Sequence, residues 1–207
     1  MIAETENLEI EVKFLIEDPE VMRERLLAAG AELIRPRVYE RNVRFDTADN
    51  ALLQKEELLR LRQDTAVILT FKGPSAYDRL SEAKVREEIE VQVDDFERLA
   101  SILMRLGYEP KQEYEKYRET FRLGDLEIVL DEMPYGNFME LEGNEADIKL
   151  AAAAFDLEWQ DRILSNYLAM MGILAEFHNL PFQDVTFANF KDSKISIKDV
   201  LPLQDDR

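Results

Sequence analysis

Charged and apolar residues alternate in several short stretches of this chain, as expected of strands with one charged and one apolar face. In the first stretch, at 8–16, Glu9, Glu11 and Lys13 fall on one face, while Ile10 and Val12 fall on the other. The same parity recurs at 58–64, 66–72, 87–93, 116–123, 126–132 and 140–142. Carboxylate pairs and cation pairs occupy different strands. This sorting favours a closed surface on which metal-binding oxygens face anion-binding nitrogens over an ordinary solvated sheet face.

A helix with clear start and stop signals is predicted after the first strand, at about 19–29. Asp18 is the expected N-cap, Pro19 takes the first helical position and Gly30 follows the last turn. Its predicted apolar stripe consists of Val21, Leu26 and Leu27.

A second helix with the same punctuation is predicted at about 95–106. Asp94 or Asp95 is the expected cap, and Gly107 is the stop signal. The apolar positions on one face are Phe96, Leu99, Leu103 and Leu106.

The two helices belong to what we interpret as an internal duplication. Glu9 and Glu88 are separated by nearly the same number of residues as Gly30 and Gly107, and a strand opening with Tyr-Glu follows each helix, at 39–46 and 114–121. A strand–helix–strand–strand unit would thus occur twice. Two such halves can pair into a closed, mostly antiparallel barrel, which removes exposed strand edges.

An inside-out barrel follows from the parity of the strands. The apolar faces would point outward and pack under the helices, and the charged faces would line the lumen. Such a lumen is costly unless acids and bases pair or bind ligands. The predicted inward acids are Glu9, Glu11, Glu88, Glu90, Asp131, Glu140 and Glu142. The predicted inward bases are Lys13, Arg60, Arg62, Lys72, Arg86, Lys116, Arg118 and Arg122.

The C-terminal region departs from this pattern. Residues 146–156 are alanine-rich and predicted to be helical, and 158–172 form a second predicted helix. The stripe on that helix consists of Trp159, Ile163, Leu164, Tyr167, Leu168 and Met171. We expect these helices to cover the barrel or to serve a homodimer contact. We place the tunnel domain at 1–172 and a C-terminal extension at 173–207.

Composition and charge restrict the function. With 34% charged and 46% hydrophobic residues, the chain is expected to be a soluble globular protein. Its net charge of −18 argues against binding a nucleic-acid polymer, although not against a small polyanion held with divalent cations. No cysteine is present, and a single histidine, His178, makes zinc sites and Ser-His-Asp triads improbable. The N-terminal residues contain no basic or apolar leader pattern and no run long enough to span a membrane, so we expect a cytoplasmic location without membrane contact.

The strand at 9–13, with its Glu-x-Glu-x-Lys pattern, resembles the N-terminal signature of the CYTH family, the triphosphate tunnel metalloenzymes. The likeness extends over roughly 8–170. It includes FDT at 45–47, LRLR at 59–62, TFKGP at 70–74, REEIEV at 86–91, KYR at 116–118, LDE at 130–132 and ELEG at 140–143. The resemblance implies an α+β fold, with a closed eight-stranded antiparallel β-barrel whose charged lumen binds a linear triphosphate with Mg²⁺ or Mn²⁺.

The same resemblance implies roles for individual residues. The metal ligands would be Glu9, Glu11, Asp131, Glu140 and Glu142. The triphosphate would be bound by Lys13, Arg60, Arg62, Lys72, Arg86, Lys116 and Arg118, with Arg44 a further candidate. Lys13 with the Glu88/Glu90 pair would be the catalytic positions.

Three functions remain open at this stage. In a metal-dependent triphosphatase, water attacks a bound triphosphate: inorganic triphosphate, thiamine triphosphate or a nucleoside triphosphate. In a class IV adenylate cyclase, a ribose 3′-hydroxyl attacks the α-phosphorus of ATP and releases pyrophosphate. A non-catalytic polyphosphate-binding module is the third reading. All three require a small-molecule polyanion as partner.

Overall fold

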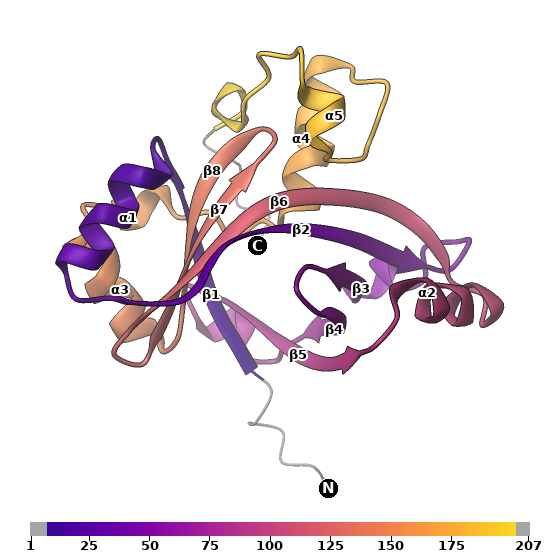
Figure 1. Ribbon diagram of the computed structural model, residues 1–207, viewed down its shortest axis with the longest axis horizontal. Coiled ribbons are helices and arrows are strands. Elements are labelled where there is room, and N and C mark those ends of the chain that lie inside the picture. The colour runs from indigo at the N-terminus through magenta and orange to yellow at the C-terminus, as the bar shows by residue number, and fades with distance from the viewer. Residues whose placement is uncertain (1–7, 202–207) are drawn as a thin grey trace, which may run out of the picture.

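A closed antiparallel sheet forms the body of the molecule. The computed structural model describes residues 8–201, and within this range eight strands close on themselves in the order β1-β5-β4-β3-β2-β6-β7-β8 (Figure 1). The strands are β1 (Leu8–Ile16), β2 (Glu32–Asp46), β3 (Leu58–Gln63), β4 (Val67–Pro74), β5 (Lys84–Val93), β6 (Glu109–Leu123), β7 (Leu126–Met133) and β8 (Gly136–Glu142). The predicted eight-stranded tunnel is therefore confirmed. The expectation that the chain has no leader concerns residues 1–7 and lies outside the described residues.

Helices lie on the outside of the sheet and at one end of it. They are α1 (Pro19–Ala28), α2 (Phe96–Arg105), α3 (Glu145–Ala154), α4 (Tyr167–His178) and α5 (Phe187–Phe190), with 3₁₀ turns η1 (Leu53–Lys55), η2 (Asp78–Leu80), η3 (Trp159–Asp161) and η4 (Ile197–Asp199). Figure 1 shows α1 and α3 together on one side, α2 on the opposite side, and α4 and α5 beyond the ends of β7 and β8.

The element order supports the duplication inferred from the spacing of the motifs. The order strand–helix–strand–strand–strand occurs twice, from β1 to β4 and from β5 to β8, so each half holds one strand more than predicted. The two longest strands, β2 and β6, occupy matching places in the two halves. They pair from Glu32 opposite Arg122 to Asp46 opposite Glu109, and Figure 1 shows them arching side by side. This pairing joins the halves into one tunnel.

The predicted caps of α1 are present, but its predicted stripe is partly wrong. The Asp18 carboxylate accepts a hydrogen bond from the backbone N–H of Glu20 at 2.9 Å, and Gly30 has φ of +86°. The buried positions are Met22 and Leu26, one turn apart. Val21 and Leu27 are 54% and 41% exposed, because they flank the 22/26 face that packs on the barrel.

The second helix follows its prediction more closely. Asp95 is the cap, since its carboxylate accepts from the Arg98 N–H at 3.0 Å. Phe96 and Leu103 are buried, whereas Leu106 is 69% exposed because the helix ends at Arg105 and places it beyond the last turn.

Most of the apolar strand faces pack outward, as the inside-out arrangement predicts. One core lies under α1 and α3 and includes Phe14, Leu26 and Ile148, and another lies under α2 and includes Leu61 and Phe96. The coverage is incomplete on β5, where Ile89 and Val91 are about half exposed. The expectation that every apolar face is covered is therefore wrong for this strand.

The predicted helix at 146–156 is confirmed as α3, but the single helix at 158–172 is wrong. Ile163 is extended and exchanges two backbone hydrogen bonds with Lys13, at 2.7 and 3.2 Å. The β1 edge is paired with β5 only as far as Glu11, so residue 163 satisfies backbone groups that would otherwise be unpaired. The helix begins instead at Tyr167, capped by Asn166.

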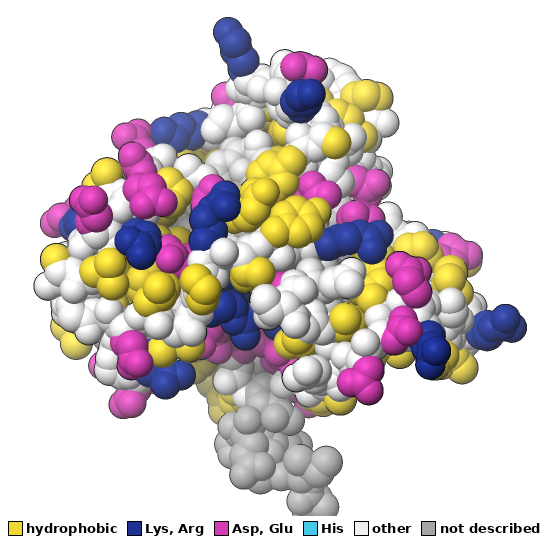
Figure 2. Space-filling view, viewed as in Figure 1, with side chains coloured by type: hydrophobic (Ala, Val, Ile, Leu, Met, Phe, Trp, Pro, Cys, Tyr) yellow, Lys and Arg dark blue, Asp and Glu magenta, His cyan; other side chains and the backbone are white. Residues whose placement is uncertain are grey.

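The C-terminal segment packs against the sheet through an aromatic core. This core includes Tyr135, Phe138, Tyr167 and Phe190, and it covers one end of the tunnel. Within residues 8–201, no helix is long and apolar enough to cross a membrane. Acidic and basic side chains are interspersed over the face in Figure 2.

Candidate functional site

The strand register brings the predicted acidic residues to one wall of the lumen. On β1 and β8, Glu11 lies opposite Glu142 and Lys13 lies opposite Glu140. Residues directly opposite one another on antiparallel strands share a face. These four side chains and Glu9 therefore face the same space, as their sequence parity predicts.

Lysines neutralise most of this wall. The ammonium of Lys13 lies 2.8 Å from Glu11 and 3.3 Å from Glu140, and Lys72 lies 2.5 Å from Glu9. Burial alone would raise the pKa of Glu11, but Lys13 and Lys84 hold it well below its usual value. Glu11 therefore stays ionised, although its side chain is buried.

Glu142 is the exception on the acidic wall. Its carboxylate makes no hydrogen bond or ion pair to any residue in the range 8–201. Burial, followed by the nearby charges of Glu9 and Glu127, raises its pKa to about 8. Glu127 and Glu11 lie opposite Glu142 on its two neighbouring strands. Lys13 and Lys84 pair with Glu11, and neither pairs with Glu142.

The opposite side of the lumen is basic. Arg118 donates to Asp131 at 2.7 Å through Nε and to Glu140 at 2.7 Å through Nη2. Lys116 is buried and donates to Asp131 at 3.0 Å. Burial raises the pKa of Asp131, but Arg118 and Lys116 outweigh it and the pKa is lowered. Asp131 is thus a charged anchor for the two cations.

Arg60 and Arg62 extend the basic side along β3, and both retain donors without partners. Arg60 donates to the hydroxyls of Tyr114 and Thr70, at 3.2 and 3.0 Å, and Arg62 lies 3.6 Å from Asp64. The Nε atoms of both arginines are buried, and neither has a hydrogen-bond partner within the described residues. Buried donors of this kind are rare in native proteins and point to a ligand or water.

The predicted catalytic carboxylates lie beside this basic side. Glu88 lies 3.3 Å from Lys72, and Glu90 accepts a hydrogen bond from Thr70 at 2.6 Å. Burial and the neighbouring carboxylates raise the pKa of Glu88 to about 7, despite the opposing charges of Lys72 and Arg60. A carboxyl group with this pKa can exchange a proton near neutral pH.

Three further basic candidates lie in surroundings that differ from those of Arg60, Arg62, Lys116 and Arg118. Arg86 donates to the backbone carbonyls of Gly73, at 2.8 Å, and of Glu56, so its guanidinium links β4 to the turn before β3. Arg44 is paired with Asp46 at 2.9 Å. Arg122 keeps the lumen-facing parity of Arg118 and lies opposite Glu127, but it is exposed, one residue before the end of β6.

Sequence reasoning missed two lumen residues on β2. Glu40 lies opposite Lys116, and Asn42 lies opposite Arg62 and Tyr114, and both are fully buried. Burial raises the pKa of Glu40, but the charges of Lys116, Arg118, Arg62 and Arg60 outweigh it and lower the pKa to about 2. The alternation of the polar residues Glu40, Asn42 and Arg44 could have predicted that these side chains face the lumen. This pattern was hard to recognise because the outward face of the strand carries Tyr39 and Arg41 in place of aliphatic residues.

Tyr167, at the start of α4, contacts this basic side from the closed end. Its hydroxyl donates to the Oδ2 atom of Asp131 at 2.7 Å. Its ring centroid lies 5.6 and 5.3 Å from the ammonium groups of Lys13 and Lys116. Since burial and the charges of Asp131 and Glu140 raise the pKa of Tyr167 well above its usual value, the hydroxyl remains a donor.

Tyr167→Phe should therefore lower the free energy of unfolding by about 1.5–3 kcal/mol, because the lost hydrogen bond has a charged acceptor. Tyr135→Phe is the matched control, since the Tyr135 hydroxyl donates to the neutral backbone carbonyl of Tyr167 at 2.8 Å and its loss should cost about 1 kcal/mol. Urea denaturation of both variants measures the difference. Equal losses would show that the charge of Asp131 adds nothing.

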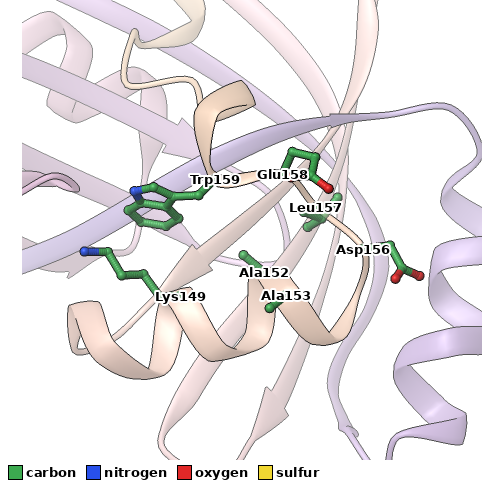
Figure 3. Close-up of a pocket in the computed structure, with 7 residues that line it drawn as sticks. All are labelled: Lys149, Ala152, Ala153, Asp156, Leu157, Glu158 and Trp159. Carbon is green, nitrogen blue, oxygen red and sulfur yellow. The ribbon is translucent and has the colours of Figure 1, made fainter.

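A separate hollow lies outside the tunnel, between α3 and η3, with a volume of about 320 Å³. Figure 3 shows its lining, which includes Lys149, Glu158 and Trp159. The indole of Trp159 donates to Glu82, and Lys149 is paired with Glu82 at 2.6 Å. None of the predicted metal, phosphate or catalytic residues line this hollow.

The carboxylates do not converge into a preformed metal cluster. Among residues 8–201, no group of three or more Asp, Glu or His side chains is arranged to hold an ion. Lys13 and Lys72 instead supply the positive charge that neutralises these carboxylates. The donor set is nevertheless all oxygen, which suits Mg²⁺ and Mn²⁺, and the crowded carboxylates around Glu142 carry the negative charge that a cation would neutralise.

Comparison with known proteins bears on this tunnel. The model of the CYTH domain matches residues 7–166, more than half of the chain. The chain belongs to the CYTH family. The match confirms the resemblance in the motifs, and it ends one residue before α4 begins, so most of the segment that covers the closed end lies outside it.

One relative by sequence and two solved structures are similar to this chain. A Methanocaldococcus jannaschii protein, provisionally named an adenylate cyclase, is 33% identical over 143 residues, which cover 68% of this chain and 79% of that protein. A structure from Vibrio parahaemolyticus, also provisionally named an adenylate cyclase, has a TM-score of 0.67 and 22% identity and covers 78% of this chain and 95% of that one. A Hippeastrum structure has a TM-score of 0.54 and 18% identity, and covers 79% of this chain and 94% of that one. That protein is an adenylyl cyclase candidate described as having a dominant triphosphatase activity.

Proposed function

We propose that this CYTH protein is a divalent-metal-dependent phosphohydrolase that cleaves a triphosphate inside the tunnel. The observation that carries the proposal is the juxtaposition of two walls in one lumen. Carboxylates from β1 and β8 lie on one side, and buried arginines and lysines from β3 and β6 lie on the other. A linear triphosphate carries several negative charges along its length, and it matches this arrangement better than a neutral ligand does.

The phosphate oxygens would bind on the basic side. Arg60 and Arg62 hold buried Nε donors that have no hydrogen-bond partner within residues 8–201, and guanidinium groups bind phosphate oxygens with well-directed hydrogen bonds. Arg118 and Lys116 are held in place by Asp131, so their positions are fixed before a substrate arrives. Fixed cations lower the barrier of phosphoryl transfer because they need not reorganise as charge develops.

The metal would be held by the acidic wall, with Glu9, Glu11, Glu140 and Glu142 as ligands and Asp131 beside them. When bound, Mg²⁺ or Mn²⁺ supplies positive charge that neutralises phosphate oxygens and favours attack by an oxygen nucleophile. Lys13 lies between Glu11 and Glu140, where it can both orient these carboxylates and contact a phosphate. Glu88 and Glu90 would assist from β5.

A cyclase is the second candidate, and the name of the M. jannaschii relative favours it. It would use the same walls but hold ATP so that the ribose 3′-hydroxyl reaches the α-phosphorus. The Hippeastrum protein, whose fold is shared, shows that a protein first considered a cyclase can be mainly a triphosphatase. Fold alone does not separate the two reactions.

Product analysis distinguishes a triphosphatase from a cyclase. The protein is incubated with inorganic triphosphate, ATP or thiamine triphosphate, each with Mg²⁺, Mn²⁺ or EDTA. We expect inorganic triphosphate to be cleaved to orthophosphate and pyrophosphate only with a metal, and ATP to give little cyclic AMP. 3′-Deoxy-ATP should be cleaved by a hydrolase and should not react in a cyclase. Cyclic AMP as the main product, with pyrophosphate in equal amount, would contradict the proposal. Tight binding without turnover would indicate a polyphosphate-binding module.

A further inference from the structure

Two buried carboxylates, Asp131 and Glu40, lie among the cations of the basic side, and their contacts differ. Asp131 accepts hydrogen bonds from Lys116, Arg118 and Tyr167. Glu40 is fully buried, yet neither of its carboxylate oxygens has a hydrogen-bond partner within residues 8–201. Its one ion pair in that range is with Lys116, at 3.6 Å. Asp131 can therefore orient its neighbours through hydrogen bonds, whereas Glu40 acts on them through its charge.

The strand order places Glu40 between two pairs of cations. Its strand, β2, lies between β3, which carries Arg60 and Arg62, and β6, which carries Lys116 and Arg118. Glu40 is directly opposite Lys116 in the pairing of β2 with β6. Burial raises the pKa of Glu40, but these four cations outweigh it and lower the pKa to about 2, so the carboxylate is ionised at neutral pH. A fixed negative charge thus lies within the group of cations that is proposed to bind phosphate.

A buried anion in this position has two opposing effects. Before a substrate binds, it offsets part of the mutual repulsion of the four cations, which are costly to bury together without compensating charge. Once a triphosphate is bound, the same charge repels the phosphate oxygens, because like charges interact strongly over several ångströms in a poorly solvated site. The Glu40 oxygens are fully covered, so they do not contact the ligand. The repulsion therefore lowers affinity without any direct contact.

We propose that Glu40 limits the affinity of the tunnel for polyphosphate anions, by offsetting part of the positive charge of the basic side so that the phosphate product is released. A diphosphate product keeps several negative charges, and four uncompensated cations would retain it. The inference rests on the proposed function in one respect, namely that the triphosphate binds in the lumen. It adds that one lumen acid opposes substrate binding, in contrast to the acids of β1 and β8, which would favour it through a metal.

The test is the Glu40→Gln variant, which keeps the size of the side chain and removes its charge. Isothermal titration with Mn²⁺ present measures the Kd for inorganic triphosphate and for pyrophosphate. Each Kd is expected to fall by roughly 5- to 50-fold, whereas a variant that merely damages the site would bind more weakly. Glu113→Gln is the matched control, because it removes the same charge from a side chain paired with Arg41 outside the barrel. Its Kd values should change by no more than about twofold, since solvent screens a charge at that site.

Two further variants separate the charge of Glu40 from its shape. Glu40→Asp keeps the charge on a shorter side chain, so its Kd for triphosphate should lie near that of the unaltered protein and well above that of Glu40→Gln. Asn42→Asp adds a second carboxylate on the same face of β2, opposite Arg62, and should weaken triphosphate binding by roughly 5- to 50-fold. This variant tests the inference even if Glu40→Gln does not fold. Unchanged or weaker binding in folded Glu40→Gln, or unchanged binding in Asn42→Asp, would overturn the inference.

The unaltered protein distinguishes this failure from failure of the proposed function. If it does not bind inorganic triphosphate in the presence of Mn²⁺, the proposed function is refuted and the inference with it. If it binds and cleaves inorganic triphosphate, but the Glu40→Gln variant has a normal circular dichroism spectrum and binds triphosphate no more tightly, the inference alone is refuted.

Discussion

Replacing Glu140 and Glu142 together with glutamine is expected to abolish metal-dependent turnover, with a fall in kcat of at least about 1000-fold, because metal neutralisation of phosphate charge contributes several kcal/mol. Glutamine keeps the shape of each side chain and removes the charge that a hard cation requires. The two residues share the acidic wall with Glu11 and Lys13, which lie opposite them on β1.

The fold should survive this change. Without the charge of Glu140, Lys13 still pairs with Glu11 and Arg118 still pairs with Asp131. At Glu142 a neutral amide replaces a carboxyl group whose pKa is raised to about 8 by burial and, after it, by the charges of Glu9 and Glu127, so the substitution removes an ionised form that the site disfavours. Circular dichroism and thermal unfolding should therefore resemble those of the unaltered protein.

Steady-state rates over a range of Mn²⁺ concentrations provide the measurement. The control variant carries Glu113→Gln and Glu132→Gln, two carboxylates that pair with Arg41 and Arg37 on the outside of the barrel. It should keep the normal rate and metal dependence. Retained activity with normal metal dependence in the Glu140/Glu142 variant would contradict the assignment of the metal ligands to the acidic wall.

Removing the basic side should have the second largest effect, this time on substrate affinity. Arg60→Ala and Arg62→Ala should each raise the Kd for inorganic triphosphate by roughly 10- to 150-fold, since a hydrogen bond to a charged group contributes about 1.5–3 kcal/mol. Binding of Mn²⁺ in the absence of substrate should change little, because the acidic wall is intact.

The alternative is that these arginines only neutralise buried acids. In that case each substitution would strand a buried carboxylate and lower stability by about 3–5 kcal/mol. We expect a smaller loss of stability for Arg60→Ala, because its partners Glu88 and Glu90 are not fully buried, with side chains 20% and 37% exposed. Each also has a second contact, Glu88 with Lys72 and Glu90 with Thr70.

Isothermal titration with Mn²⁺ and triphosphate, together with thermal unfolding, separates the two roles. Arg41→Ala is the matched control, since Arg41 pairs with Glu113 at 2.8 Å on the outer surface and should not affect affinity. A large drop in melting temperature with unchanged affinity in the Arg60 or Arg62 variants would favour the purely structural role.

Local sequence rules were sufficient for much of the barrel. Alternation on β1, β3, β4 and β7 assigned each side chain to the lumen or the exterior, because the pleat of a strand leaves only two directions. Caps such as Asp18 and Gly30 fixed helix ends for the same reason: their conformations depend on adjacent residues alone. The rules failed at the C-terminal region, where 158–172 has helical periodicity but Ile163 is extended.

That failure has a tertiary cause. The free edge of β1 at Lys13 requires backbone partners, and no pattern within 158–172 reveals an edge elsewhere in the chain. The same limit applies to Tyr167. Its place in an apolar stripe predicts packing, whereas its hydroxyl bonds to Asp131 only because α4 covers the end of the tunnel.

Periodicity and short motifs were enough to predict the closed sheet, the family and most of the side chains that face the lumen, although Glu40 and Asn42 on β2 were missed. Only the tertiary structure decided how those charges are shared. It paired Lys13 with Glu11 and Glu140 and turned Arg86 to the carbonyls of Gly73 and Glu56. Among the described residues, it left the carboxylate of Glu142 and the buried amide of Asn42 without a hydrogen-bond partner. Such pairings depend on distances of a few ångströms between different strands, which are set when the barrel closes.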